Sequence, residues 1–250
     1  MSGHSKWANI KFRKEIADKK KGKIFTKLAQ QITIAARENS EIKLRLAIEK
    51  AKQANLPAEN IERAVKRGKG ELEGIKLEDI IYEAFASEKV AVLISATTDN
   101  KNRTTQEIRN VLERNGGKLS GAGSVNWMFE QKGLIRIETG GRDREEIELA
   151  AIDAGAEDVQ EEENEILIYT RPENLEKVKN SLKAQEFIIT NFEISSVPKD
   201  LIKITEPEKA KKILKLMNEL DNLAEVNSVS ANFDIPDELI ESAEAHSGGI

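Results

Sequence analysis

Hydrophobic positions in the first third of the chain follow a helical period. Ile24, Leu28, Ile32 and Ala35 recur at spacings of three and four residues, which is typical of one face of an α-helix. Two shorter stripes follow, formed by Leu44, Ala47, Ile48 and Ala51 and then by Ile61, Ala64 and Val65. Three short helices with short connections predict a helical bundle over residues 24–75. Residues 1–23 lack such a period, and we predict an arm there.

The pattern changes to strands and helices beyond the bundle. Residues 133–197 predict the order strand, helix, strand, strand, helix, strand of a ferredoxin-like unit, with a hairpin turn at Glu163 and Asn164. In this unit Asp143 caps a helix that Gly155 ends, and Pro172 starts the second helix.

The segments on either side of this unit each predict strand, helix, strand. The expected strands are 90–96, 125–129, 201–204 and 226–231, and the helices are 103–114 and a stretch following Thr205 and Glu208, which resemble a capping box. Neither half can bury a sheet face alone, so we predict that 76–132 and 198–235 pair into one discontinuous domain around an inserted 133–197. Residues 236–250 are expected to be a frayed tail. The predicted fold class is multidomain α+β: an N-terminal three-helix bundle followed by two α/β lobes, at least one of them ferredoxin-like, with the middle lobe discontinuous.

Charge is unevenly divided along the chain. Residues 1–70 contain 18 Lys/Arg and 7 Asp/Glu, a formal charge of +11, whereas residues 71–250 contain 21 and 37, a charge of −16. A basic face captures polyanions, and the acidic remainder repels them. Enrichment in Lys and Glu also accompanies life at high temperature, but habitat does not explain why the two signs are separated.

Several classes of chemistry are missing from the sequence. The chain has no cysteine, which excludes disulfides and thiolate metal sites, and its two histidines, His4 and His246, lie at opposite ends. It contains no phosphate-binding loop motif, and the acids at 161–163 are interpreted as a solvated hairpin tip. We therefore expect no catalytic residue, no cofactor, no metal and no enzyme activity. An N-terminus without an apolar signal segment and the absence of a long apolar run predict a cytoplasmic protein that does not enter membranes.

The arm and the end of the third helix are the candidate nucleic-acid-binding regions. In the arm, cations alternate with aromatic rings that can stack on unpaired bases. The alternative is a solvated tail whose Trp7 packs on the domain. The third helix ends in cations that also suit the helix dipole, so a structural role there is an equal alternative. The residues concerned are Lys6, Trp7, Lys11, Arg13, Lys14, Lys19, Lys20, Lys21, Lys23 and Lys27 in the arm and its continuation, and Arg63, Lys66 and Arg67 in the helix.

Two polar loops have structural and functional interpretations. The first, at residues 97–104, contains Asp99, Asn100, Asn102 and Arg103 between a strand and a helix. These are good turn and cap residues, and they also form a possible partner-binding site. The second loop, at 116–123, is rich in glycine; we favour a helix cap and turn, and its alternative is close backbone approach to a phosphate or partner.

The sequence resembles the YebC family of probable transcriptional regulators over nearly its whole length. The stretches that carry the resemblance are GHSKWANIKFRK (3–14), GKIFTKL (22–28), NIERAVKRG (60–68), TDNKNRT (98–104), GSVNWMF (123–129) and LIYTRPENLEKV (167–178). The resemblance implies a three-domain architecture and DNA binding in some members. In other members it implies action on translation at the ribosome, including relief of stalling, and one mitochondrial branch activates translation. It implies no catalytic residues.

Three functions remain open on the sequence. The first is a transcriptional regulator that binds DNA. The second is a ribosome-associated translation factor that binds ribosomal RNA, and the third is a protein-interaction scaffold whose basic arm binds an acidic partner.

Overall fold

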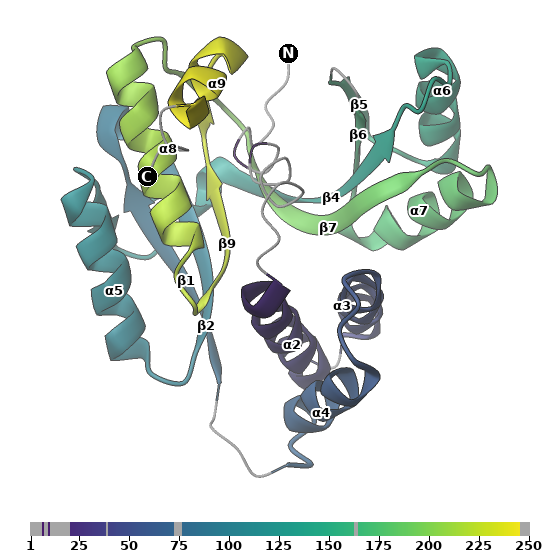
Figure 1. Ribbon diagram of the computed structural model, residues 1–250, viewed down its shortest axis with the longest axis horizontal. Coiled ribbons are helices and arrows are strands. Elements are labelled where there is room, and N and C mark those ends of the chain that lie inside the picture. The colour runs from purple at the N-terminus through teal and green to yellow at the C-terminus, as the bar shows by residue number, and fades with distance from the viewer. Residues whose placement is uncertain are drawn as a thin grey trace.

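The computed structural model describes Trp7, Ile10 and residues 21–38, 40–72, 77–162 and 165–245; of residues 21–24 and 243–245 the backbone alone is described. Three helices near the N-terminus lie beside two larger lobes, each built on its own four-stranded sheet (Figure 1). None of the described helices is both long enough and apolar enough to cross a membrane.

The N-terminal helices are α2 (Lys21–Arg37), α3 (Glu41–Gln53) and α4 (Ala58–Gly68). Their inward faces are the stripes predicted above, and Leu28, Ile32, Ala51 and Ile61 form their shared core. The hydroxyl of Ser40 accepts a hydrogen bond from the Lys43 amide at 3.4 Å and caps α3.

In the sequence, Gly68 follows the third apolar stripe, where a helix cap with positive φ is expected. The structure gives that conformation to Gly70, at 74°. A Cβ at Gly68 would instead stand 2.2 Å from the Thr33 carbonyl oxygen and 2.6 Å from the Ala36 Cβ. Gly68 therefore permits the close approach of α4 to α2.

Replacing Gly68 by alanine should destabilise the protein by about 1–3 kcal/mol, because the added methyl group overlaps a backbone atom that cannot rotate away. Alanine has the higher helix propensity, so propensity alone predicts the opposite sign. Chemical denaturation followed by circular dichroism measures the change. Gly121→Ala is the matched control, since no atom lies within 4 Å of its Cβ position. A Gly68→Ala protein as stable as the wild type would contradict this packing.

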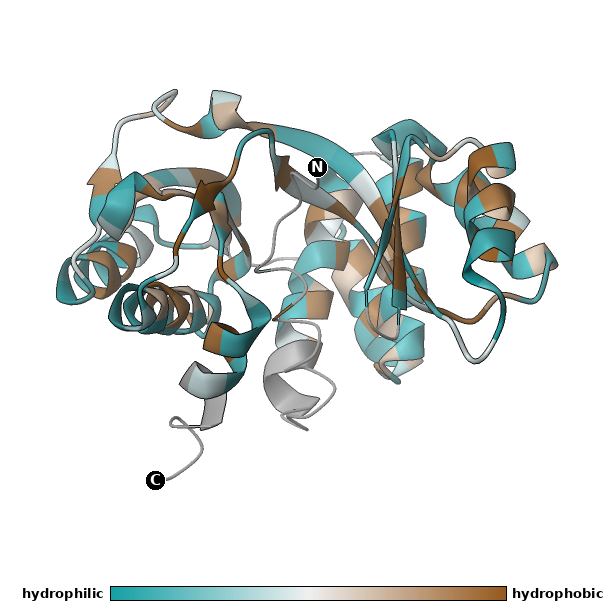
Figure 2. Cartoon of the chain, turned by 90° about the horizontal axis from the view of Figure 1, so that it is seen from above, coloured by the Kyte–Doolittle hydropathy of each residue, from teal (hydrophilic) through white to brown (hydrophobic). Residues whose placement is uncertain are grey.

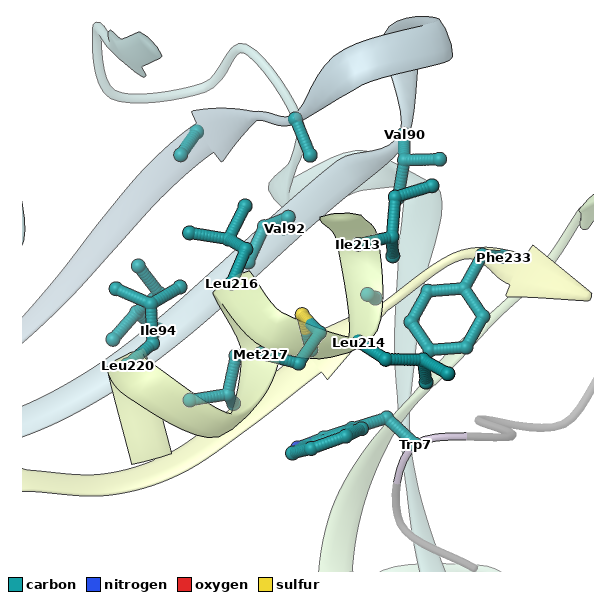
Figure 3. Packing of buried hydrophobic residues seen from close by; sticks show 14 of the residues in the cluster. Trp7, Val90, Val92, Ile94, Ile213, Leu214, Leu216, Met217, Leu220 and Phe233 are labelled. Carbon is teal, nitrogen blue, oxygen red and sulfur yellow. The ribbon is translucent and has the colours of Figure 1, made fainter. Parts of the chain in front are cut away.

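The middle lobe joins segments that are distant in the sequence. Its sheet has the order β3-β1-β2-β9, so a strand from beyond residue 220 pairs with strands from before residue 130. Helices α5 and α8 cover one face and share the largest core (Figure 3). The elements are β1 (Glu78–Phe85), β2 (Ala91–Thr98), α5 (Lys101–Arg114), β3 (Lys118–Ser120), α8 (Pro207–Asp221) and β9 (Val226–Ala231), with a short parallel pair β8 (Ile202–Lys203) and β10 (Phe233–Asp234), and α9 (Asp237–Ala245).

The other lobe is the ferredoxin-like unit. Its antiparallel sheet has the order β5-β6-β4-β7, and α6 and α7 pack on one face around Ile135, Ile147 and Val178. The opposite face is also buried, at Leu134, Leu167 and Tyr169. The elements are β4 (Phe129–Glu138), α6 (Arg144–Ala154), β5 (Asp158–Glu161), β6 (Glu165–Thr170), the 3₁₀ turn η3 (Pro172–Asn174), α7 (Leu175–Ala184) and β7 (Ile189–Pro198). The predicted hairpin turn at Glu163 and Asn164 lies outside the described residues, between two paired strands.

Helices α5, α7 and α8 direct hydrophobic positions toward their sheets and mostly polar positions outward (Figure 2). Helix α6 also packs on its sheet, but it exposes Leu149 and Ile152. The α+β class, the helical N-terminal part and the discontinuous middle lobe are confirmed. The residue limits of the domains stay a prediction.

Three local predictions are wrong, and one strand was not predicted. The stretch 125–129 is not a strand, because residues Asn126–Met128 form the 3₁₀ turn η2 and β4 begins at Phe129. The strand that was not predicted is β1, which has the acidic sequence EDIIYEAF and lies between β3 and β2 in the sheet. The capping box fails because α8 begins at Pro207 with Glu206 as its cap residue and no side-chain hydrogen bond. The tail is helical through Ala245, and Ile240 in it is buried.

Candidate nucleic-acid interface

The arm cations lie mostly outside the described residues. This applies to Lys6, Lys11, Arg13, Lys14, Lys19 and Lys20, whereas Lys21 and Lys23 lie in the first turn of α2 with backbone alone described. The two arm residues that are described, Trp7 and Ile10, are both helical and both buried.

Trp7 anchors the arm to the middle lobe. Its side chain is 1% exposed and belongs to the core formed with α8, where it lies close to Leu214 and Met217 (Figure 3). Ile10, one helical turn further on, joins the same core at 4% exposure. In this structure the indole ring therefore has no free face for a base, and the packed alternative describes Trp7 better than the stacking role.

Lys27 has a structural partner. Its ammonium donates to the carbonyl oxygen of Asp221 at 2.6 Å, at the last residue of α8. A cation at this position complements the negative end of the helix dipole. Lys27 therefore ties α2 to the middle lobe and is not held free for a phosphate.

The cations of α4 are exposed, and some are paired. Arg63 lies 2.9 Å from Glu59 and Lys66 lies 2.7 Å from Glu62, each one turn apart. The hydrogen bond and the charge of Glu62 raise the pKa of Lys66. Within the described part of the chain, no carboxylate is in ion-pair distance of Arg67, which is exposed at the end of the same helix. Exposed pairs of this kind contribute little to stability and can exchange a carboxylate for a phosphate.

A groove runs between α2 and α4 beside these cations. Its volume is about 710 Å³, and Arg63 and Arg67 lie on its wall with Phe25 and Ala29. The side-chain oxygen of Gln30, also on the wall, is buried, and none of the described groups donates a hydrogen bond to it. The structure thus brings two of the three predicted α4 cations into one depression.

One side of helix α3 faces the ferredoxin-like lobe. Leu46 is buried in that lobe's core, Arg45 pairs with Glu176 at 2.7 Å, and Lys50 pairs with Glu193 at 3.1 Å. Lys179 of α7 reaches back to Glu49 of α3. By sequence, Lys43, Arg45, Lys50 and Lys52 could extend the surface of the α4 cations, but Arg45 and Lys50 serve as contacts between domains.

The polar loop before α5 is internally satisfied. The side chain of Asn100 accepts from the Arg103 amide at 3.1 Å and caps the helix, and Arg103 bridges Asp99 at 2.8 Å and Glu225 at 2.7 Å. Asn102 is exposed in the first turn. These contacts favour the structural interpretation of Asp99, Asn100 and Arg103.

Sequence reasoning missed the loop between β3 and β4. The carboxylate of Glu83, which is 6% exposed, accepts hydrogen bonds from the amides of Gly123 and Val125, each at 2.6 Å, and of Asn126 at 2.9 Å. This clamp holds Trp127 at the surface with 63% of its side chain exposed. A tryptophan directly after a glycine-rich polar segment was the available signal.

Comparison with known proteins identifies the family. A model described as the TACO1/YebC protein N-terminal domain matches residues 5–71, and one described as the TACO1/YebC second and third domain matches residues 77–233. The chain belongs to the TACO1/YebC family. The resemblance found in the sequence is thereby confirmed.

Relatives match the chain from end to end. A protein of Dictyoglomus thermophilum is 48% identical over 248 residues, covering 97% of this chain and 99% of the relative, and one of Halothermothrix orenii is 46% identical, covering 96% and 98%. Both bear the name probable transcriptional regulatory protein. A crystal structure of a conserved hypothetical protein from Aquifex aeolicus superposes with a TM-score of 0.81 at 45% identity, covering 88% of this chain and 92% of that one. The TACO1/YebC relatives thus carry regulatory names, which fits the regulator interpretation at the level of the family.

Proposed function

We propose that this TACO1/YebC protein binds nucleic acid through its basic N-terminal head (residues 1–70) and acts, without catalysis, as a DNA-binding regulator of transcription. The observation that carries the proposal is the segregation of charge, +11 on the head against −16 on the rest of the chain. Such a distribution concentrates phosphate contacts at the basic end of the molecule.

The contacts around the head narrow down the cations available for phosphates. Lys27, Arg45 and Lys50 are engaged with the two lobes. The cations that remain as candidates for phosphate contacts are the arm lysines and those at the exposed end of α4, where Arg63 and Arg67 lie beside the groove. The arm precedes the first turn of α2, whereas the end of α4 packs beside Thr33 and Ala36 in the last turns of α2, so the two regions are separate candidates for phosphate contacts.

Replacing Lys19, Lys20, Lys21 and Lys23 by alanine should weaken duplex DNA binding and make it less sensitive to salt. Each phosphate contact contributes a slope of about −0.9 to the logarithm of affinity against the logarithm of salt concentration, so losing four contacts should flatten the slope by about 3–4. Fluorescence anisotropy with a labelled duplex at several salt concentrations measures both quantities.

The matched control removes four exposed lysines from the acidic body: Lys203, Lys211, Lys212 and Lys215. This control changes net charge by the same amount, so it should leave the slope unchanged if contacts are confined to the head. Equal effects of the two variants would show that only net charge matters. No binding to any nucleic acid at low salt would leave the third function, a scaffold for an acidic partner.

A ribosome-associated translation factor is the second candidate, and the position of α3 favours it. Bases in the major groove are commonly read by a helix that enters the groove. One side of helix α3 contacts the ferredoxin-like lobe through Leu46 and the Arg45–Glu176 pair, which restricts such an insertion of α3. A head that contacts phosphates without inserting this helix suits ribosomal RNA as well as DNA.

Two measurements separate the two candidates. A sequence-specific footprint on a promoter supports transcriptional regulation. Cosedimentation of the purified protein with ribosomes, abolished by the arm substitutions and retained by the acidic-body control, supports the translation factor.

A further inference from the structure

An exposed tryptophan stands out on the surface of the middle lobe. Trp127 lies in η2 with 63% of its side chain exposed, whereas Trp7 is 1% exposed. The other large hydrophobic side chains exposed in the described part of the chain are aliphatic: Ile42, Leu72, Ile81, Leu149, Ile152 and Ile188. Aromatic rings contribute more to recognition than aliphatic side chains of similar exposure.

The ring of Trp127 is held in place by its own loop. Its Nε1 donates to the carbonyl oxygen of Ser124 at 3.1 Å, so the indole has no polar atom left to satisfy. The loop is itself fixed by the three amide hydrogen bonds to Glu83. A pre-positioned ring loses little conformational freedom on binding, which lowers the entropic cost of recognition. What the indole still offers a partner is its π faces.

The surroundings of Trp127 fit a base better than a protein. Gly121 and Gly123 are exposed, and no atom lies within 4 Å of their Cβ positions, which leaves open space beside the loop. A protein hot spot is usually ringed by contacts that exclude water. The two open glycine positions provide no such ring on their side of the loop, whereas a single base needs only the face of an indole.

A positive charge accompanies the ring. The ammonium of Lys199 donates to the backbone oxygen of Trp127 at 2.8 Å, and Lys199 is exposed. This places one cation at the backbone of the residue that carries the ring, where it can neutralise a phosphate near a stacked base. Aromatic faces interleaved with cations are the usual means of binding single strands without base preference.

We propose that Trp127, supported by Lys199, is a stacking platform for an unpaired base of single-stranded nucleic acid. The proposal rests on the nucleic-acid binding proposed above and adds a second contact point on a different domain. The platform acts on unpaired bases alone, because the faces of paired bases are covered by their neighbours in the duplex.

The test compares three substitutions at position 127 in the full chain. Trp127→Leu removes the π face and should lower affinity for a single-stranded oligoadenylate on the order of 10-fold. Trp127→Phe keeps an aromatic face and should retain most of the affinity, and Trp127→Ala should match the leucine variant. Affinity for duplex DNA should be the same in all four proteins. Leu149→Ala is the matched control, since Leu149 is 64% exposed on α6 of the other lobe.

Fluorescence reports on the ring directly. In a Trp7→Phe protein Trp127 is the sole tryptophan, and oligoadenylate should quench its emission, whereas duplex DNA should not. If the Trp127→Leu protein binds the oligoadenylate as tightly as the wild type does, the stacking platform is wrong. The proposed function would not be affected by that result. If the wild type binds neither single nor double strands, both proposals fail.

Discussion

Replacing Trp7 by alanine should lower the free energy of unfolding by about 3–5 kcal/mol, the usual range for removing a buried tryptophan. The indole is 1% exposed and fills space beside Leu214, Met217 and Phe233 (Figure 3). The cavity left by alanine has walls from α8 and the sheet, which are held by the rest of the core and cannot close over it. Urea denaturation followed by circular dichroism measures the loss.

Trp7→Phe separates packing from hydrogen bonding. Among the described residues, none accepts a hydrogen bond from the Trp7 Nε1, so the ring contributes through its apolar surface. Phenylalanine preserves part of that surface and should cost about 1–2 kcal/mol, well below the alanine variant. If alanine at position 7 leaves stability unchanged, the arm is not anchored in the core as described.

The same substitution has a consequence for binding. Trp7 and Ile10 fix the start of the arm against α8, while α2 begins at Lys21. Lys11, Lys14, Lys19 and Lys20 lie between these two points in the sequence. Loss of the Trp7 anchor should increase the freedom of these lysines and lower affinity for nucleic acid without changing the number of phosphate contacts, so the salt slope should persist.

Replacing Glu83 by alanine should lower the free energy of unfolding by about 3–5 kcal/mol, as much as Trp7→Ala, because three amide donors lose their acceptor at once. Gly123, Val125 and Asn126 all donate to this carboxylate, and the Val125 amide is buried. Each buried donor that loses its partner costs about 1–3 kcal/mol. Glu83→Gln keeps the shape with a single acceptor oxygen and should fall between alanine and the wild type. Thermal and chemical unfolding measure the series.

The pH dependence of Glu83 provides an independent check. Burial by itself would raise the pKa of Glu83, but the hydrogen bonds from the Val125, Gly123, Asn126 and Ser124 amides outweigh it and lower the pKa. A carboxyl with a lowered folded-state pKa contributes stability at pH values above its unfolded pKa of about 4.3. That contribution is lost as the pH falls through the folded pKa. The difference in stability between wild type and Glu83→Gln should therefore shrink below about pH 4; a constant difference would contradict the role of the charge.

Loss of the clamp should also disturb Trp127. The amides bound by Glu83 belong to the loop that sets the position of the indole. Glu83→Gln is therefore expected to broaden or shift the emission of Trp127 more than that of Trp7. This outcome would connect the stability of the loop to the proposed stacking platform.

The helical bundle and the ferredoxin-like unit could be predicted from the local pattern of hydrophobic and polar residues. Their apolar stripes have clear periods, and their ends are marked by residues with strong conformational preferences. Asp143 caps α6 and Gly155 ends it with a φ of 105°, as predicted. Strand β9 has its predicted bounds of 226–231.

Other elements could not be predicted from the local sequence, because the residues that stabilise them are distant along the chain. Strand β1 carries Glu78, Asp79 and Glu83. In the sequence alone, three acidic residues in one short segment predict a solvent-exposed segment and not a strand of a sheet. Asp79 pairs with Arg37 of α2 at 2.8 Å, and Glu83 is satisfied by a loop some 40 residues later. Acidic residues in a strand look unfavourable in isolation and are stabilised by contacts formed only in the folded chain.

The amino-acid sequence by itself determined the fold class, the family and the separation of a basic head from an acidic body, because periodicity, motifs and formal charge are properties of the chain. Only the tertiary structure decided which of those charges are already paired and which of the two tryptophans is accessible. Trp7 looked exposed in a polar arm and is buried, while Trp127 looked like part of an apolar strand and is exposed. The physical reason is that burial and ion pairing arise between residues brought together from distant positions, such as Lys27 with Asp221 and Arg45 with Glu176.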